Sequence, residues 1–282
     1  MKQWGKEAAT SATLTHQKSS PPLCGLPPFA IMRCFLLLIL FILPLFPSSG
    51  ADYNRMILEE IRRIPAKGGY SVQDPAFDGL RAAVQPGTPY LQIQPELSRP
   101  SFCSGATYLI LLQVLNRLAA AGALELAPDI QQALLVDDPQ PDGYGVWGRW
   151  NANGPGAARL LHLTGMGESF TDLEKAKPGD FLKIFWNNEV GRDERGHLVV
   201  YLGMAHNSEG EPTVRFWSSN QPDGYGVKAV PMSEIKNMIF TRLTRPENIK
   251  SIRSLPQVDE YLSTLLKTPS SFEEARRRSG IQ

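Results

Sequence analysis

The chain has 282 residues, of which 42% are hydrophobic and 20% are charged, and its formal net charge is +1. These values are typical of a soluble globular protein with one good core and room for a smaller lobe. The nearly balanced charge provides no basic field to hold nucleic acid, so nucleic-acid binding is excluded as a function class. Composition alone identifies no activity.

The N-terminal region has the pattern of a secretory signal peptide. The run CFLLLILFILPLF, residues 34–46, follows Arg33 and precedes PSSGAD. Such a signal has a basic start, an apolar stretch too short to cross a bilayer, and small residues for cleavage, which lie here near Ala51. We therefore expect translation to start at Met32, residues 1–51 to form an N-terminal extension with a signal peptide, and the protein to be secreted or periplasmic. The alternative is an uncleaved anchor, which would then be the chain's contact with a membrane.

Five helices are predicted next, from apolar residues at helical spacing and from proline and glycine stops. They are expected at about residues 52–64, 76–84, 101–121, 129–136 and 156–163. The run DDPQPDGYGVWGRWNANGPG, residues 137–156, is rich in turn residues and predicts a loop between the last two.

The hydrophobic period then changes to that of β-strands. Five short segments rich in β-branched and aromatic residues are separated by turn residues, at 181–186, 197–204, 213–219, 225–231 and 238–244. Successive strands with short links pair in antiparallel fashion. Helices followed by strands predict an α+β fold with an antiparallel sheet of about five strands, over residues 52–245. Residues 246–282 are expected to form a helical tail, with a docked VDEYLSTLL segment and a solvated charged end.

Cys103 is the one cysteine that remains without residues 1–51, because Cys24 and Cys34 lie in that segment. In an exported protein it has no partner for an intrachain disulfide, so it is either an inert buried residue or a reactive thiol. Its position is the first turn of the predicted 101–121 helix. Free backbone N–H groups and the helix dipole favour a thiolate there, which favours reaction over packing.

A thiol nucleophile needs a base, and three histidines follow residue 51. His162 lies in a helix that is predicted to pack, and His206 lies in a polar hairpin loop. His197 begins a strand after the loop NNEVGRDERG and is best placed to lean toward the start of a helix that crosses the sheet. We therefore interpret His197 as the candidate base.

The base in turn needs a residue that orients its ring. The following strand ends in FWSSN, which places Ser218 and Asn220 on one face of the sheet. Either side chain can hold the ring, and Asn220 is preferred because an amide oxygen is the better acceptor.

These residues resemble the NlpC-type papain-like cysteine peptidases of bacterial cell walls. That family has Cys-Ser-Gly at a helix start, Pro-Gly-Asp before the first strand, a histidine that opens a strand ending in Tyr-hydrophobic-Gly, and a polar residue on the next strand. The chain has CSG at 103–105, KPGDFLKIF at 177–185, HLVVYLG at 197–203 and FWSSN at 216–220. It departs from the family in having Phe102 where an acidic residue is usual, in a long insertion before Pro-Gly-Asp, and in the type of the third residue.

The resemblance implies a papain-like fold and a hydrolase of amide bonds, in which Cys103 attacks a carbonyl, His197 transfers the proton and Asn220 is the third residue. The implied substrate is a peptide stem of peptidoglycan. The residues expected to bind it are Trp147, Trp150, Tyr144, Tyr225 and Ser218. The motif QPDGYGV occurs at 140–146 and again at 221–227, beside tryptophan in both places. This arrangement is compatible with two loops that line one cleft.

Two alternatives remain open. A papain-like thioester can pass its acyl group to an amine or an alcohol instead of water, because cleft shape and water access select the acceptor. The protein can also be an exported binding domain in which Cys103 is inert. No cofactor and no metal are expected, since the chain has no HExxH, CxxC, P-loop or complete dinucleotide-binding turn.

Overall fold

The computed structural model describes residues 52–137 and 140–282, which lie in one compact unit with an α+β fold. The predicted signal peptide lies outside these residues. The α-helices are α1 (Tyr53–Ile61), α2 (Asp74–Ala83), α3 (Cys103–Ala120), α4 (Pro128–Ala133), α5 (Gly145–Asn151), α6 (Gly156–Thr164), α7 (Glu260–Thr264) and α8 (Phe272–Arg278). Short 3-10 helices are η1 (Pro95–Leu97), η2 (Leu173–Lys175), η3 (Met232–Glu234) and η4 (Pro246–Ser254). None of the helices in the described residues is both long and apolar enough to cross a membrane.

Within the described residues, the main sheet has seven strands in the order β1-β8-β7-β6-β5-β9-β4, and all neighbours pair antiparallel. Its strands are β1 (Lys67–Gly68), β4 (Gly167–Phe170), β5 (Phe181–Phe185), β6 (Gly196–His206), β7 (Pro212–Asn220), β8 (Gly224–Pro231) and β9 (Asn237–Leu243). A separate ribbon pairs β2 (Val84–Gln85) with β3 (Gln92–Ile93).

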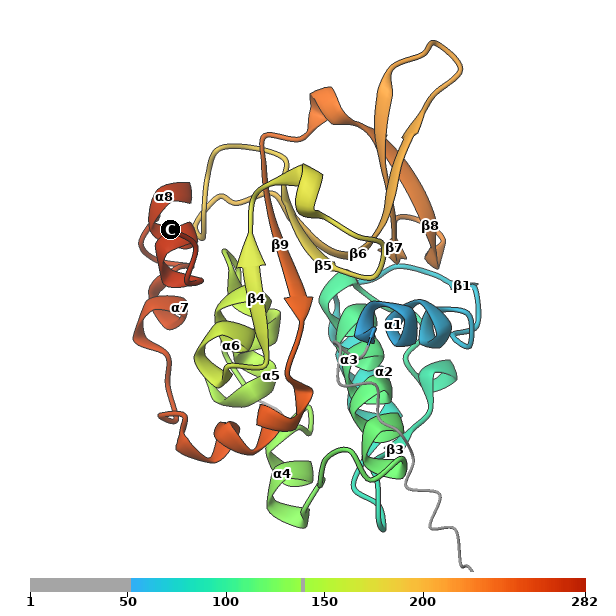
Figure 1. Cartoon of the computed structure of the whole chain (residues 1–282), viewed down its shortest axis with the longest axis vertical. Helices are drawn as coiled ribbons and strands as arrows, with labels where there is room; N and C mark the ends of the chain where they lie inside the picture. The colour runs from blue at the N-terminus through green and yellow to red at the C-terminus, as the bar shows by residue number, and fades with distance from the viewer. Residues whose placement is uncertain (1–51, 138–139) are drawn as a thin grey trace, which may run out of the picture. The chain divides into compact units, whose positions relative to one another are not determined.

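The main core lies between the helices and one face of the sheet. Figure 1 shows the sheet above α3 and α5. Helix α3 is buried on almost every side because it contacts α1, α5, β6 and β7, as is typical of an apolar core helix. Leu198 and Trp217 belong to this core, whereas Val199 and Phe216 belong to a smaller core on the opposite face. Strand alternation produces this division.

The α+β class is confirmed, and the five predicted strands are β5 to β9, but the sheet is larger than the predicted five strands. The two additional strands, β1 and β4, have the sequences KG and GESF. β1 has no β-branched or aromatic residue, and β4 has only Phe170, so neither has a clear strand pattern of its own. Each forms by pairing with a longer strand, β1 with β8 and β4 with β9.

The predicted loop over residues 137–156 is wrong in its second half, where GVWGRWN forms α5. Trp147 and Trp150 are buried on this helix, and the ring centre of Trp147 lies 5.1 Å from that of Tyr108 on α3. The Trp150 indole N–H donates to the carbonyl of Ser104 at 3.1 Å. Burial of two large rings therefore overrides the low helix propensity of the glycines.

The charged end of the chain forms a helix, on which Glu273, Arg277 and Arg278 are exposed as predicted. Residues 271–280 include α8, and Ala275 and Ser279 are buried. Arg159 of α6 donates to the Asp259 carboxylate at 2.7 Å and to the carbonyl of Arg278 at 2.9 Å. The tail is therefore held against α6 by hydrogen bonds, one of them to the buried Asp259 carboxylate.

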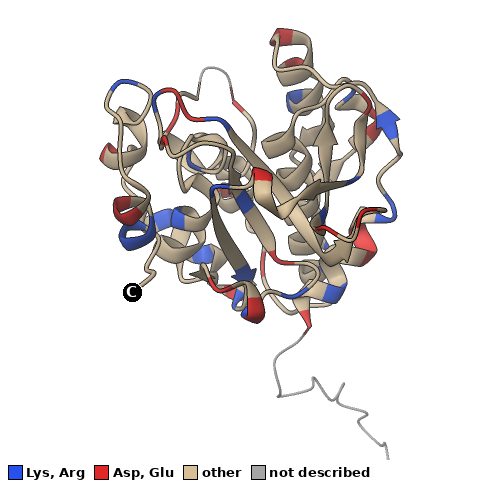
Figure 2. Cartoon of the chain, turned by 90° about the horizontal axis from the view of Figure 1, so that it is seen from above, with Lys and Arg blue, Asp and Glu red and all other residues tan. Residues whose placement is uncertain are grey.

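Acidic and basic residues are interspersed along the ribbon in the view of Figure 2. The carboxylate of the Pro-Gly-Asp motif, Asp180, is fully buried and accepts hydrogen bonds from Asn54 of α1 at 2.8 Å and from Arg242 of β9. This motif thus ties a helix to the sheet. The ion pairs with a buried carboxylate that join distant segments include Asp180 with Arg242 (2.7 Å), Glu194 with Lys183 (2.6 Å) and Asp259 with Arg159 (2.7 Å).

Residues 67–71, called the strap below, connect the edge of the sheet to the start of α3. The N–H groups of Gly69 and Tyr70 donate at 3.0 and 3.1 Å to carbonyls of the turn before β8. On the other side, Ser71 N–H donates to Ser101 C=O at 3.0 Å and Ser101 N–H donates to Gly69 C=O at 3.1 Å. The strap therefore fixes Tyr70 between the helix start and the sheet.

Gly224→Ala is expected to destabilise the protein more than Gly210→Ala. Both glycines have positive φ, +88° and +80°, but a Cβ at Gly224 would lie 2.6 Å from the Gly69 oxygen, whereas a Cβ at Gly210 has no atom within 4 Å. Gly210→Ala should cost roughly 1–2 kcal/mol for the backbone conformation. Gly224→Ala should cost at least about 1 kcal/mol more because the strap must move. Urea unfolding measures both, and equal losses would contradict the contact.

Candidate active site

Cys103 is the first residue of α3, where the extended backbone of Phe102 turns into helix. The first bond of the helix runs from the Ala106 N–H to the Phe102 carbonyl at 2.9 Å. The N–H groups of residues 103–105 precede this ladder, as at every helix start. The partly buried sulfur therefore lies beside backbone donors and the positive end of the helix dipole.

His197 lies near the beginning of β6, on the face of the smaller core by strand alternation. Its ring centre is 5.6 Å from that of Phe216 and 6.5 Å from that of Trp186. Nε2 lies 3.1 Å from Oδ1 of Asn220, and the ring also lies within hydrogen-bonding reach of the Cys103 sulfur. The structure thus brings Cys103, His197 and Asn220 together in one row at the rim of the sheet.

The orientation of Asn220 determines which ring nitrogen faces the sulfur. Its amide nitrogen donates to the carbonyls of Ser218 at 3.2 Å and Gly226 at 2.9 Å. Its oxygen is therefore the acceptor toward His197, and Nε2 must carry the hydrogen of that bond. This leaves Nδ1 for the sulfur, as an acceptor in the neutral ring and as a donor in the imidazolium.

The thiol of Cys103 ionises more readily than an ordinary cysteine. Burial raises its pKa, but the hydrogen bond with His197 and the charge of that ring lower it by more, with smaller help from the Leu198 N–H and the charge of Lys183. The resulting pKa is about 7, below the usual value of 9.0. The lowered pKa increases the share of the nucleophilic thiolate near neutral pH.

Two cavities open beside the Cys103–His197 pair. The thiol cavity, of about 230 Å³, is lined by Cys103 and by residues of α5 and α6. The histidine cavity, of about 370 Å³, is lined by His197 and Asn220. Tyr70 and Gly196 line both cavities, so they adjoin there. The cleft therefore has space on each side of the reacting groups.

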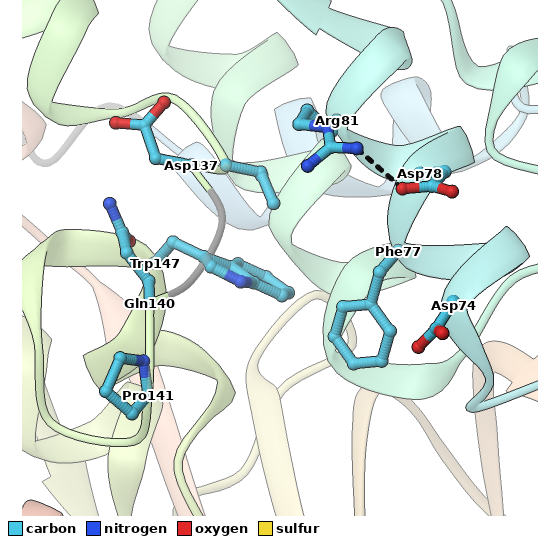
Figure 3. A pocket seen from close by; sticks show the side chains of 9 residues that line it. Asp74, Phe77, Asp78, Arg81, Asp137, Gln140, Pro141 and Trp147 are labelled. Carbon is cyan, nitrogen blue, oxygen red and sulfur yellow. Dashed lines mark hydrogen bonds and ion pairs between the residues drawn. The ribbon is translucent and has the colours of Figure 1, made fainter.

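A third cavity, called the aromatic cavity below, adjoins the thiol cavity because Phe77 of α2 lines both. Its volume is about 380 Å³. Figure 3 shows the rings of Phe77 and Trp147 on its opposite sides. The Phe77 side chain thus lies between the aromatic cavity and the thiol cavity.

Three site residues were not predicted from the sequence. Tyr70 comes from the strap, and burial, followed by the charge of Cys103, raises the pKa of its hydroxyl to about 12. Lys183 of β5 lines the thiol cavity, and its ammonium pairs with Glu194 at 2.6 Å. Asp142 lines the same cavity, and burial raises the pKa of its carboxyl. The sequence contains no spacing signal for Tyr70. Asp142 lies in the first QPDGYGV motif, whose repeat is its only signal, and Lys183 follows from strand pairing, because it lies opposite Leu198.

The expected substrate-binding residues are only in part at the cleft. Trp150 lines the thiol cavity and Trp147 the aromatic cavity. Tyr144 lies outside both parts of the cleft, beside Val258. Tyr225 and Ser218 are buried: the Tyr225 hydroxyl donates to Ser98 C=O and the Ser218 hydroxyl donates to Leu198 C=O, both at 2.9 Å. Their role in the structure is packing, and they contribute no surface to the cleft.

The other candidates can also be placed. His162 and His206 are exposed, the first on α6 and the second at the end of β6. Both copies of QPDGYGV reach the cleft, through Asp142 at the thiol cavity and Gln221 at the histidine cavity. Among residues 52–137 and 140–282, no group of three or more His, Cys, Asp or Glu side chains is placed to hold a metal ion.

Fold and site together define an α+β protein with a cysteine, a histidine and an asparagine in one row at the start of a core helix. Comparison of the chain with models of protein families, with curated protein sequences and with solved structures found no match. The interpretation of the site therefore depends on its own geometry and chemistry.

Asn220→Ala is expected to release the His197 ring, whereas Ser218→Ala is not. Only the Asn220 oxygen accepts from Nε2, so its loss should mix the two tautomers of the neutral ring under mildly alkaline conditions. Ser218→Ala leaves a buried carbonyl without its partner and should cost roughly 1–3 kcal/mol of stability without changing the tautomer. Imidazole ¹⁵N NMR in a Cys103→Ala background distinguishes them, and an unchanged tautomer in Asn220→Ala would refute the orienting role.

Proposed function

We propose that the protein is a cysteine hydrolase of amide bonds, with Cys103 as nucleophile, His197 as base and acid, and Asn220 as the residue that orients His197. The observation that carries the proposal is the row of Cys103, His197 and Asn220 at the rim of the sheet, with a thiol pKa lowered to about 7. A buried structural cysteine has its pKa raised, which is the opposite effect.

In the proposed reaction, the Cys103 thiolate attacks the carbonyl carbon and the C=O electron pair moves onto oxygen. The tetrahedral intermediate then collapses, the C–N bond breaks, and the His197 imidazolium gives its Nδ1 proton to the leaving amine. The thioester that remains is attacked by water, from which His197 takes a proton. Collapse of the second intermediate releases a carboxylic acid and restores the thiolate–imidazolium pair.

The oxyanion of each intermediate needs hydrogen-bond donors near the sulfur. The backbone N–H groups at the start of α3 are one source. The Tyr70 hydroxyl is the second, since Tyr70 lines both cavities where they adjoin and its charge state is coupled to that of Cys103. Because its pKa is about 12, this hydroxyl stays protonated and able to donate throughout the neutral range.

The proposed substrate is a peptide, and specifically a peptidoglycan stem peptide, cleaved by a protein that is exported through its N-terminal signal. The two adjoining cavities support a peptide because they give room to a chain on each side of the cleaved bond. The stem peptide is proposed from the resemblance to the NlpC-type peptidases. Export is proposed from the apolar run at residues 34–46.

Purified peptidoglycan stem peptides should be cleaved by the protein and not by Cys103→Ala. In water enriched in ¹⁸O, hydrolysis should place one heavy oxygen in the new carboxylate, since water attacks the thioester. Mass spectrometry of the products measures this. Conversion of the peptide only when an amine acceptor is added would show acyl transfer instead, and equal products with Cys103→Ala would refute a cysteine nucleophile.

Tyr70→Phe should lower kcat for this cleavage roughly 10- to 1000-fold, because one oxyanion donor is lost. KM should change little, since the ring remains. Tyr108→Phe is the matched control: it removes a buried tyrosine hydroxyl that donates to Leu134 C=O within the core and lines neither part of the cleft. Equal kcat values in Tyr70→Phe and Tyr108→Phe would contradict the role of Tyr70.

A further inference from the structure

The aromatic cavity combines ring faces with negative charge. Its walls are Phe77 of α2 and Trp147 of α5, and Figure 3 shows both side chains directed toward the space between them. Three aspartates and one arginine line the cavity. The arginine, Arg81, pairs with Asp78 at 2.6 Å. The lining side chains are therefore net negative. The aspartates are Asp74, Asp78 and Asp137.

This cavity lies directly beside the nucleophile. Phe77 lines both the aromatic cavity and the thiol cavity. The ring centre of Phe102, the residue before Cys103, lies 4.5 Å from that of Phe77 and 6.1 Å from that of Trp147. A group held between Phe77 and Trp147 is thus separated from the start of α3 by a single aromatic side chain.

The proposed reaction places one part of the substrate in this direction. His197 must reach the leaving amine to protonate it, so the amine part lies on the side of the histidine cavity. The acyl part, bonded to Cys103 in the thioester, then lies in the thiol cavity. Because Phe77 lines both the thiol cavity and the aromatic cavity, we infer that a chain continuing past Phe77 reaches the aromatic cavity.

We propose that the aromatic cavity binds a primary ammonium group on an aliphatic stem, carried by the acyl part of the substrate. The assignment to the substrate rests on the proposed function, whereas the binding of the ammonium group does not. Aromatic ring faces attract a cation electrostatically, and the ring walls also cover an apolar stem. The aspartates favour a cation and disfavour an anion of the same shape. A neutral apolar group would use the rings but gain no attraction from the carboxylates of Asp74 and Asp137.

Direct binding tests the cavity without any catalytic step. The full chain is titrated with pentylammonium and, as a neutral ligand of the same length, with pentan-1-ol, by ligand-detected NMR at low ionic strength. Pentylammonium should bind roughly threefold to tenfold more tightly than pentanol. Added salt should reduce this preference, since it screens the carboxylates. Equal binding of the two ligands, or no saturable binding of pentylammonium, would overturn the proposal.

Variants locate the binding. The double change Asp74→Asn with Asp137→Asn should remove the preference for pentylammonium, whereas Glu209→Gln, in the exposed β6–β7 hairpin loop, should keep it. Phe77→Leu retains an apolar wall without a ring face and should weaken pentylammonium binding roughly twofold to fivefold. Circular dichroism establishes that each variant is folded. An undiminished preference in the double variant would place the binding elsewhere and overturn the proposal.

Substrate preference tests the second half of the proposal. Peptides that differ only in lysine or norleucine at positions N-terminal to the cleaved bond are compared by kcat/KM. A preference for lysine that the double variant loses is the expected result, and the same kcat/KM for both peptides would overturn the assignment to the acyl part. If no peptide is cleaved, the proposed hydrolase fails, while the amine titration still decides whether the cavity binds an ammonium group.

Discussion

The site depends on the buried junction between the start of α3 and the sheet. The Ser101 hydroxyl donates to the Ser219 hydroxyl at 2.8 Å, and the Tyr225 hydroxyl donates to the Ser98 carbonyl at 2.9 Å. All of these groups are buried, so breaking one pair would leave a polar atom without water or partner, at a cost of about 1–3 kcal/mol. The junction determines where Cys103 lies relative to His197, because the two residues come from different layers of the fold.

The same junction explains why the pKa of a partly buried thiol is lowered. Burial alone raises the pKa of a thiol, and only a closely placed donor and positive charge reverse this. The reversal at Cys103 comes first from His197. His197 is held in turn by Asn220, whose amide nitrogen is fixed by two backbone carbonyls of the sheet. Asn220 is thus positioned by backbone atoms of the sheet, and its side chain in turn positions the His197 ring.

Sequence reasoning found the parts of the site that depend on regular periodicity. A cysteine at a helix start, a histidine at a strand start and an asparagine at a strand end follow from local patterns, and the structure places these residues together. Strand alternation also placed Ser218 and Asn220 on one face. Alternation could not show that the Ser218 hydroxyl donates to the Leu198 carbonyl instead of orienting His197, because this hydrogen bond depends on pairing across the sheet.

The parts that sequence reasoning missed arise from contacts between distant segments. β1 and the strap exist because residues 67–70 pair with the β8 region, and Tyr70 enters the cleft only through this pairing. α5 forms because Trp147 and Trp150 are buried against α3. The last residues of the tail pack back because Arg159 also donates to the carbonyl of Arg278. None of these contacts leaves a local pattern, so none can be found from periodicity alone.

The most direct measurement is the rate of alkylation of Cys103 as a function of pH, in the full chain and in His197→Ala, followed site by site by peptide mass spectrometry. Alkylation consumes the thiolate. In the native protein the rate should rise with a midpoint near the pKa of about 7. In His197→Ala, burial remains without the opposing ring, so the midpoint should move above 9.0, the usual value. Identical pH profiles in the two proteins would contradict an activated nucleophile and leave Cys103 as a packing residue.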